Sequence, residues 1–240
     1  MRLNPNLDRI NLGCGPNAPS GWLNIDGSWN AWLSNHSWIR RGLMVAGIID
    51  KKNPGAEWKV CPLVHELTKP LPLSDESVFA VYASHVLEHL YVADAKRLLL
   101  ECRRVLKPGG VLRLVVPDLE FMARDYLAQK EITHKMNGTN NRGSAADMFN
   151  NRLRFRSPQP PQGNLFFRLY SLWKDFHYHK WMYDAGSLIQ YVEDAGFSGV
   201  HQRDYLQSEI PGIAEVELAE RVLDGAGICV EGKKSLKTGP

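Results

Sequence analysis

Short apolar runs alternate with helical patterns along this chain, and the alternation predicts βαβ units and a mainly parallel sheet. The clearest buried strands are the runs at 78–84 and 111–116, because a strand covered on both faces is almost wholly apolar. Between them, residues 92–106 carry apolar side chains on one helical face, and Lys107-Pro108-Gly109-Gly110 is expected to end that helix. We expect further strands at 8–12, 22–26, 58–63, 199–203 and 228–231, and further helices at 29–45, 118–129 and 185–195.

One stretch departs from this alternation. Residues from about 130 to 163 are polar and rich in turn signals, such as Asn137-Gly138 and Pro160-Pro161. We interpret the region 130–180 as an insertion or lid. Because no separable second domain is evident, residues 1–240 are expected to form a single domain.

Composition and charge narrow the classes of function. The chain is 44% hydrophobic and 23% charged, with a net charge of +3 and no basic tail, so a nucleic-acid partner is not expected. The four cysteines are scattered without a C-x-x-C pair, which favours a reducing compartment. No signal core is evident and no apolar run approaches the ~20 residues of a membrane span. We therefore expect a cytoplasmic protein.

The first candidate for ligand chemistry is Gly13-Cys14-Gly15, which directly follows the strand at 8–12. Glycines there let the backbone turn sharply and approach a ligand, although a purely structural turn is the alternative. Asp26 ends the next strand, so in a parallel sheet it should lie beside the glycine turn at the same edge. A carboxylate there can accept both hydroxyl groups of a ribose, with ~1.5–3 kcal/mol for each charge-assisted bond.

The spacing also distinguishes between nucleosides. Gly13-x-Gly15-x-x-Ala18 formally fits the dinucleotide fingerprint, which needs a full helix before the acidic residue. Pro16, Pro19 and Gly21 lie in the short interval before Asp26, so no such helix fits. A nucleoside without phosphates is therefore the better ligand than NAD.

Several motifs in order resemble the class I methyltransferases, specifically their type-11-like branch. They span about residues 8–120, and the stretch from His179 to Phe197 resembles the C-terminal half of the family. The matching segments are Ile10-Asn11-Leu12-Gly13-Cys14-Gly15, Gly21-Trp22-Leu23-Asn24-Ile25-Asp26, Pro70-Leu71-Pro72-Leu73, Ser84-His85-Val86-Leu87-Glu88-His89-Leu90 and Leu106-Lys107-Pro108-Gly109-Gly110.

The resemblance implies an α/β fold with a Rossmann-like, doubly wound, mostly parallel seven-stranded sheet. Its last strand would be antiparallel, with a helical or loop insertion after the fifth strand. It also implies S-adenosylmethionine as the cofactor. By position, Gly13, Cys14 and Gly15 would flank its methionine portion and Asp26 its ribose. The other implied contacts are Glu66 and Leu67 at the adenine, and Ser84 and His85 near the sulfonium and the acceptor.

Methyl transfer depends mainly on alignment and exclusion of water, a contribution that reaches ~7–11 kcal/mol. A general base adds only ~10²–10⁴-fold. His85 is the first candidate because it follows a strand end; simple packing is the alternative. His177 and His179 follow the insertion, and we expect them to bind the acceptor or to pack at a surface. The weaker alternative is that both bind a metal together with His85, and no metal site is predicted.

The leading hypothesis is a methyltransferase that uses S-adenosylmethionine and acts on an oxygen or nitrogen of a small-molecule or carbohydrate-containing acceptor. A catalytically inactive nucleoside-binding protein is the first alternative, and an NAD-dependent oxidoreductase is the second. The sequence leaves a homodimer open.

Overall fold

The sheet at the centre of the molecule has the strand order β3-β2-β1-β4-β5-β7-β6. The computed structural model describes residues 7–16, 18–47, 49, 58–135, 145–155 and 178–236. Within them the sheet has seven strands: β1 (Arg9–Leu12), β2 (Leu23–Asp26), β3 (Leu63–Val64), β4 (Val78–Ser84), β5 (Leu106–Val116), β6 (Phe197–Arg203) and β7 (Ile228–Lys234). Neighbours from β3 to β5 are parallel, and β7 is antiparallel to both β5 and β6. The predicted fold class is therefore confirmed.

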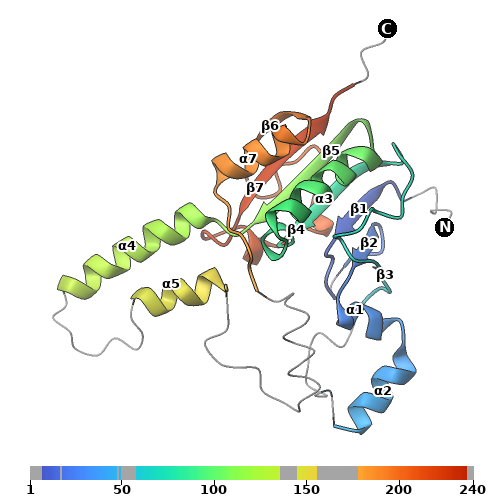
Figure 1. Ribbon diagram of the computed structural model, residues 1–240, viewed down its shortest axis with the longest axis horizontal. Helices are drawn as coiled ribbons and strands as arrows, with labels where there is room; N and C mark the ends of the chain where they lie inside the picture. Colours follow the sequence, from blue (N-terminus) through green and yellow to red (C-terminus); the bar gives the residue numbers. More distant parts are fainter. Residues whose placement is uncertain are drawn as a thin grey trace.

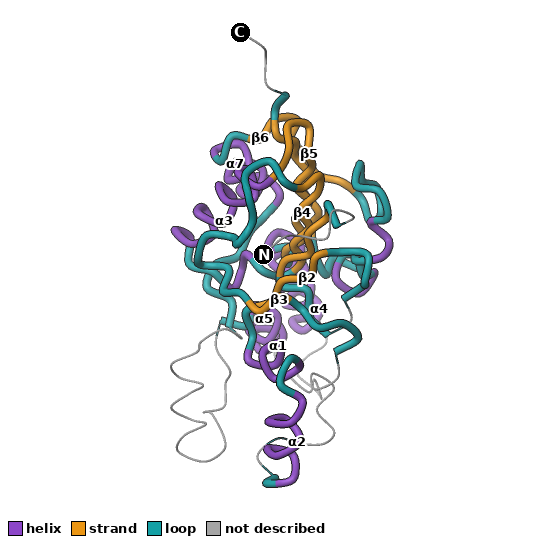
Figure 2. The backbone as a smooth tube through the Cα atoms, turned by 90° about the vertical axis from the view of Figure 1, so that its right-hand side faces the viewer, coloured by secondary structure: helices purple, strands orange, loops and turns teal. Residues whose placement is uncertain are grey.

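Each face of the sheet has its own apolar core. Helices α3 (Val92–Val105) and α7 (Ala185–Asp194) cover one face (Figure 2). Their buried side chains belong to the same apolar core as those of the strands. The segment 204–227 covers the other, with the short helices η3 (Ile213–Glu215) and η4 (Ala219–Arg221). Covering on both faces explains the nearly continuous apolar runs of β4 and β5.

The remaining helices lie at the carboxyl edge of the parallel strands. Helices α1 (Trp29–Ser34) and α2 (Ser37–Val45) follow β2, and α4 (Leu119–Lys135) follows β5 (Figure 1). Helix α5 (Ala145–Leu153) lies beside α4, with the rings of Tyr126 and Phe149 5.1 Å apart. The short helix η2 (Leu87–His89) follows β4 at the same edge.

The register of β1 positions the functional edge. Leu12 pairs with Ile25 of β2 on one side and with Ala83 of β4 on the other. The loops after these three strands therefore begin at one level. The chain order reverses between β1 and β4, which is the point where open α/β sheets bind ligands.

Several element boundaries differ from the sequence predictions. The helix expected at 29–45 is two helices, because His36 leaves the helical conformation and stacks on Trp32 with ring centroids 4.1 Å apart. The strand expected at 58–63 is only Leu63–Val64. The turn expected at 107–110 lies inside β5, which follows α3 directly; here the register against β4 shifts, and Gly109 has a φ of +78°.

The predicted insertion at 130–180 is described only in part. Its residues 136–144 and 156–177 lie outside the described residues, and the candidate His177 is among them. The described part contains α5 at 145–153, a helical part of the predicted helical or loop insertion. Arg152 on α5 forms an ion pair with Asp125 on α4 over 3.1 Å, which joins the two helices.

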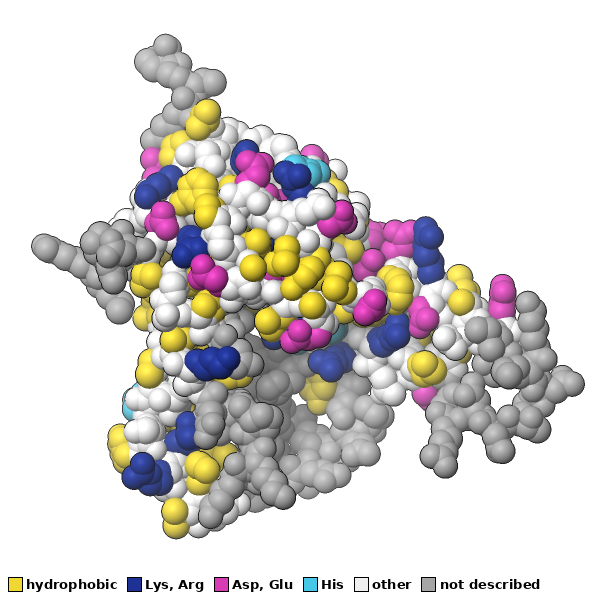
Figure 3. Space-filling model, turned by 180° about the vertical axis from the view of Figure 1, so that it is seen from behind, with side chains coloured by type: hydrophobic (Ala, Val, Ile, Leu, Met, Phe, Trp, Pro, Cys, Tyr) yellow, Lys and Arg dark blue, Asp and Glu magenta, His cyan; other side chains and the backbone are white. Residues whose placement is uncertain are grey.

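The described surface mixes charges of both signs. Seen from behind, Lys and Arg side chains are interspersed with Asp and Glu over the upper part of the visible face (Figure 3). Among the described helices, none has the length and apolar character that crossing a membrane requires.

Candidate active site at the ends of β1, β2 and β4

The turn after β1 depends on the absence of side chains at two positions. Gly13 and Gly15 have φ values of +61° and +63°, in the left-handed region that glycine adopts without strain. The backbone N–H groups of Gly13 and Cys14 both donate to the carbonyl of Ile25, over 2.8 and 3.3 Å. A Cβ atom on Gly13 would overlap a methyl group of Val86, so this turn packs tightly against the loop after β4.

Asp26 lies next to this turn, as the sequence predicted. Its side chain is buried, and its Oδ2 accepts a hydrogen bond from the N–H of Gly15 over 3.1 Å. Its Oδ1 accepts a second from the N–H of Ser28 over 2.8 Å. A carboxylate has about four lone-pair positions, so these two bonds orient it and leave about two positions for a ligand.

Gly15 differs from Gly13 in its surroundings. A Cβ atom on Gly15 would have no described atom within 4 Å. The backbone is therefore open to a ligand at Gly15, while Gly13 is needed for packing. Cys14 lies between them, half-buried, and burial together with the Asp26 charge raises the pKa of its thiol.

The loop after β3 lies directly against the loop after β2. A Cβ atom on Gly27 would come within 2.8 Å of the His65 carbonyl, so only glycine fits between the two loops. The Glu66 carboxylate accepts from Thr68 over 3.0 Å and pairs with Lys69 over 3.3 Å. Leu67 packs against the core that α3 and α7 cover. The adenine contacts of Glu66 and Leu67 stay predictions.

Ser84 and His85 lie at the end of β4. Ser84 is buried and its carbonyl accepts a hydrogen bond from Arg221 over 3.1 Å. His85 has a φ of +55°, and its Nε2 lies 3.1 Å from the Arg221 carbonyl. A carbonyl only accepts, so this nitrogen carries the proton. Burial lowers the pKa of His85 to about 4, so the ring is neutral near neutral pH.

Glu88 is a buried acid within the motif from Ser84 to Leu90. Its side chain is completely buried, and its Oε1 lies 3.4 Å from His85 Nδ1 and 4.0 Å from His89 Nε2. Burial raises the pKa of Glu88 to about 8. The one signal in the sequence was its place between two histidines on a short turn.

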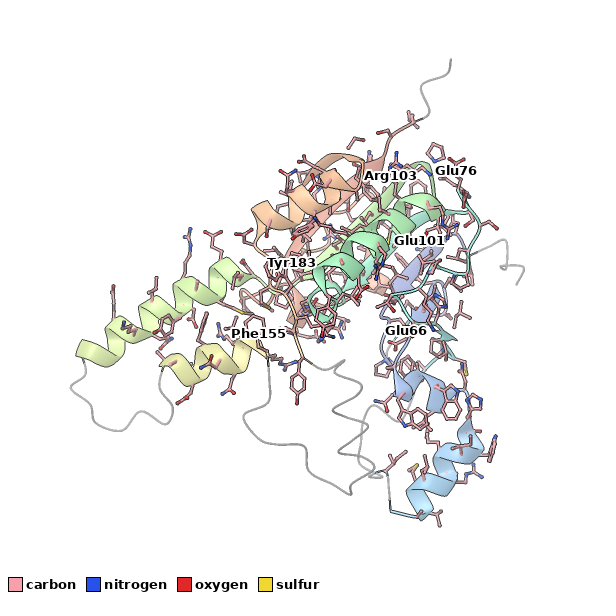
Figure 4. The ribbon with its side chains drawn as sticks, viewed as in Figure 1. Glu66, Glu76, Glu101, Arg103, Phe155 and Tyr183 are labelled. Carbon is pink, nitrogen blue, oxygen red and sulfur yellow. The ribbon has the colours of Figure 1, made fainter. Side chains whose placement is uncertain are left out.

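His179 joins the same cluster from a distant part of the chain. Its ring packs edge-on against His89 with centroids 4.9 Å apart, and burial lowers its pKa to about 4. Backbone bonds hold the segment in place: the N–H of Lys180 donates to the Glu88 carbonyl over 2.6 Å, and that of Leu119 to the Tyr183 carbonyl over 3.0 Å. Figure 4 shows Tyr183 near the start of α4 and Glu66 beside β2 and β3.

The candidates thus form two groups along one edge. Gly13, Gly15 and Asp26 make the first group, and His85, Glu88, His89 and His179 make the second. Val86 packs on Gly13 and follows His85, so it connects the groups. Sequence reasoning missed Gly27, Ser28 and Val86. Of these three, only Ser28 carried a local signal, because serine is a favourable N-cap residue. Its Oγ accepts a hydrogen bond from the backbone N–H of Ala31 in α1.

Part of the chain is similar to a known protein family. Residues 39–114 match the family model described as a methyltransferase domain, of the type-11 branch. Over these residues the chain is similar to the methyltransferase domain. The resemblance stated from the sequence is confirmed. The matched part of the chain contains β4 and α3, and the glycine turn and Asp26 precede it.

Individual relatives of the domain are distant. An uncharacterized 37.1 kDa protein in transposon TN4556 of Streptomyces fradiae is 30% identical over 122 residues, 51% of this chain and 33% of that protein. The chain thus matches about one third of this relative's length.

Among solved structures, a SAM-dependent methyltransferase from Methanosarcina mazei is 18% identical, with a TM-score of 0.47 over 97% of this chain and 94% of its own. One from Archaeoglobus fulgidus is 14% identical, with a TM-score of 0.47 over 96% and 87%.

Proposed function

We propose that this methyltransferase domain transfers a methyl group from S-adenosylmethionine to an oxygen or nitrogen of a small-molecule or carbohydrate-containing acceptor. The observation that carries the proposal is the hydrogen bond from Gly15 to Asp26 beside an open stretch of backbone. It lies where the strand order reverses, which is the usual ligand position in such sheets.

The residues present fit an adenosine without phosphates. Asp26 offers the ribose a carboxylate already held by two backbone N–H groups, so little conformational freedom is lost on binding. In the short connection from β1 to β2, the described residues 13–16 and 18–22 form no helix. A helix N-terminus, the usual partner of a pyrophosphate, is therefore missing from that described stretch.

S-adenosylmethionine supplies a methyl group that its positively charged sulfur already activates. What this chain contributes is alignment and exclusion of water, which can reach ~7–11 kcal/mol. His85 has a pKa of about 4, so it is a poor proton acceptor for a hydroxyl group. We therefore assign His85 a positioning role, since a well-matched base would add only ~10²–10⁴-fold.

The acceptor side is assigned to the histidine group. His85 and His89 are each about one quarter exposed, while Glu88 behind them is completely buried. Imidazole nitrogens bind hydroxyl and amino groups, which favours a polar acceptor atom over an unactivated carbon.

Thermal unfolding with S-adenosylmethionine, S-adenosylhomocysteine and NAD tests the ligand class. A ligand at 100 times its Kd stabilises by ~2.7 kcal/mol, and a chain of this size gains roughly 2–4 °C per kcal/mol. We expect roughly 5–10 °C with the first two compounds and no shift with NAD. A shift with NAD alone would overturn the proposal. Release of S-adenosylhomocysteine across a panel of hydroxyl and amine acceptors then tests transfer itself.

A further inference from the structure

The group around Glu88 has features that methyl transfer does not require. The Glu88 carboxyl group is completely buried, yet neither oxygen has a hydrogen-bond partner among the described residues. The buried Nδ1 of His179 likewise has no partner in the described part of the chain. Leaving such groups unsatisfied costs ~1–3 kcal/mol each, so a fold that assembles several of them at one place calls for an explanation.

The histidines are oriented as metal ligands usually are. His89 Nδ1 lies 3.2 Å from the carbonyl of Tyr178, which leaves its Nε2 on the side of Glu88. The His179 ring is hydrogen-bonded by the backbone of Leu153. A metal-binding histidine typically donates its second ring N–H to such a carbonyl, which fixes the ring and its tautomer.

We propose that Glu88, His89 and His179 bind a divalent transition-metal ion, with Zn²⁺ as the best match. One ligand atom from each residue lies within 4.8 Å of the others. Ligands ~2.1 Å from a shared tetrahedral ion lie ~3.4 Å apart, so each pair has to close by at most roughly 1.4 Å. Small side-chain rotations supply this. Two histidines and one glutamate form a known catalytic zinc set, whose fourth position is open to water or substrate.

The cationic side chains around this site do not prevent a metal ion from binding. Arg154 is exposed, so solvent screens its repulsion. The guanidinium of Arg221 is directed to the carbonyl of Ser84. The partly exposed rings of His85 and His89 provide the route by which an ion enters. Bound there, the ion links the turn after β4 to the segment at 178–180. Backbone bonds to Glu88, a Lys180 bond to His89 and a His89 bond to Tyr178 also join the two.

Metal retention by tag-free protein tests the inference without any assay of methyl transfer. The protein is stripped with a chelator, loaded with Zn²⁺, separated from free ion, and its metal content is measured. We expect about one Zn²⁺ per chain, lowered at least ~10-fold in Glu88→Gln and in His179→Gln. His201→Gln, at an exposed histidine on β6, is the matched control and should retain metal like the wild type.

Thermal unfolding separates lost ligation from lost folding. Glu88→Gln keeps the shape and removes a buried ionisable group, so its metal-free form should unfold at or above the wild-type temperature. Zn²⁺ should raise the unfolding temperature of the wild type but not that of this variant. The inference is wrong if wild-type protein retains no Zn²⁺, or if Glu88→Gln retains as much as the wild type.

Discussion

The backbone N–H of Gly15 donates a hydrogen bond to Oδ2 of Asp26 over 3.1 Å, which joins the turn after β1 to the end of β2. The backbone N–H of Ser28 donates a second hydrogen bond to Oδ1 of Asp26 over 2.8 Å. Among the described residues, two backbone N–H groups thus orient the carboxylate for a ligand. The family match begins at residue 39, so this arrangement is independent support for the proposed cofactor site.

The two glycines of this turn should respond differently to substitution. Gly13→Ala places a methyl group against Val86 as well as a side chain at a positive φ. We expect a loss of ~2–5 kcal/mol in the free energy of unfolding, from the left-handed conformation and overpacking together. Gly15→Ala has only the conformational cost of ~1–2 kcal/mol, because nothing described lies near the added atom.

Gly47→Ala is the matched control for the second variant. Gly47 has a φ of +68°, and a Cβ atom added there, as at Gly15, would have no described atom within 4 Å. Denaturant unfolding should give both variants a similar loss of stability. Only Gly15→Ala should also weaken binding of S-adenosylhomocysteine, by at least ~10-fold, since its methyl group faces the ligand. Equal binding by both variants would argue against a ligand at Gly15.

The glycine turn and Asp26 could be predicted from the sequence because one local rule connects them. Parallel neighbours in a sheet end at the same edge, so a glycine turn after one strand and an acid at the end of the next must meet. Burial on both faces likewise made β4 recognisable from its apolar run, with bounds at 78–84 as predicted.

The histidine group could not be predicted in the same way. His179 reaches Glu88 from far along the chain, and nothing in its local sequence specifies that contact. Arg113 was also unforeseen, because an arginine inside an apolar strand has no local partner. The structure supplies distant ones: Glu217 binds it through two hydrogen bonds, over 2.7 and 2.9 Å, and Glu231 lies 3.3 Å away.

Removing this buried cation should strongly destabilise the fold. Arg113 is completely buried and also donates to the carbonyls of Asp204 and Gln207, so it attaches the segment 204–217 to the sheet. Arg113→Ala leaves the buried carboxylate of Glu217 without its cationic partner, and we expect a loss of ~3–5 kcal/mol in the free energy of unfolding, measured by chemical denaturation. Arg124→Ala is the control: it removes an exposed partner of Glu120 and should lower the free energy of unfolding by less than ~1 kcal/mol. If Arg113→Ala and Arg124→Ala lost similar amounts of stability, the buried ion pairs of Arg113 would not stabilise the fold.

The cap of α7 gives a pH-dependent prediction. The backbone N–H of Ser187 donates to Asp184, and this bond holds the pKa of the carboxyl group below its usual value. A depressed pKa in the folded state means that the stabilisation is present above the unfolded pKa of ~3.9 and is lost as the pH falls through the folded value. Asp184→Ala should therefore lower the free energy of unfolding by ~1 kcal/mol at neutral pH.

The difference between wild type and Asp184→Ala should shrink as the pH is lowered below ~4, which urea unfolding at a series of pH values can follow. Asp194→Ala, at the other end of the same helix, lacks a backbone cap and serves as the control. A cost for Asp184→Ala that stays constant down to the lowest pH would contradict the assignment.

Calorimetric titration of S-adenosylhomocysteine into wild-type and Asp26→Asn protein is the most direct test of the proposed cofactor site. Asparagine keeps the shape and one acceptor oxygen but loses the charge, so we expect ~10–150-fold weaker binding, the equivalent of ~1.5–3 kcal/mol. Asp194→Asn, on the surface of α7, should bind like the wild type. Unchanged affinity in a folded Asp26→Asn protein would contradict the account.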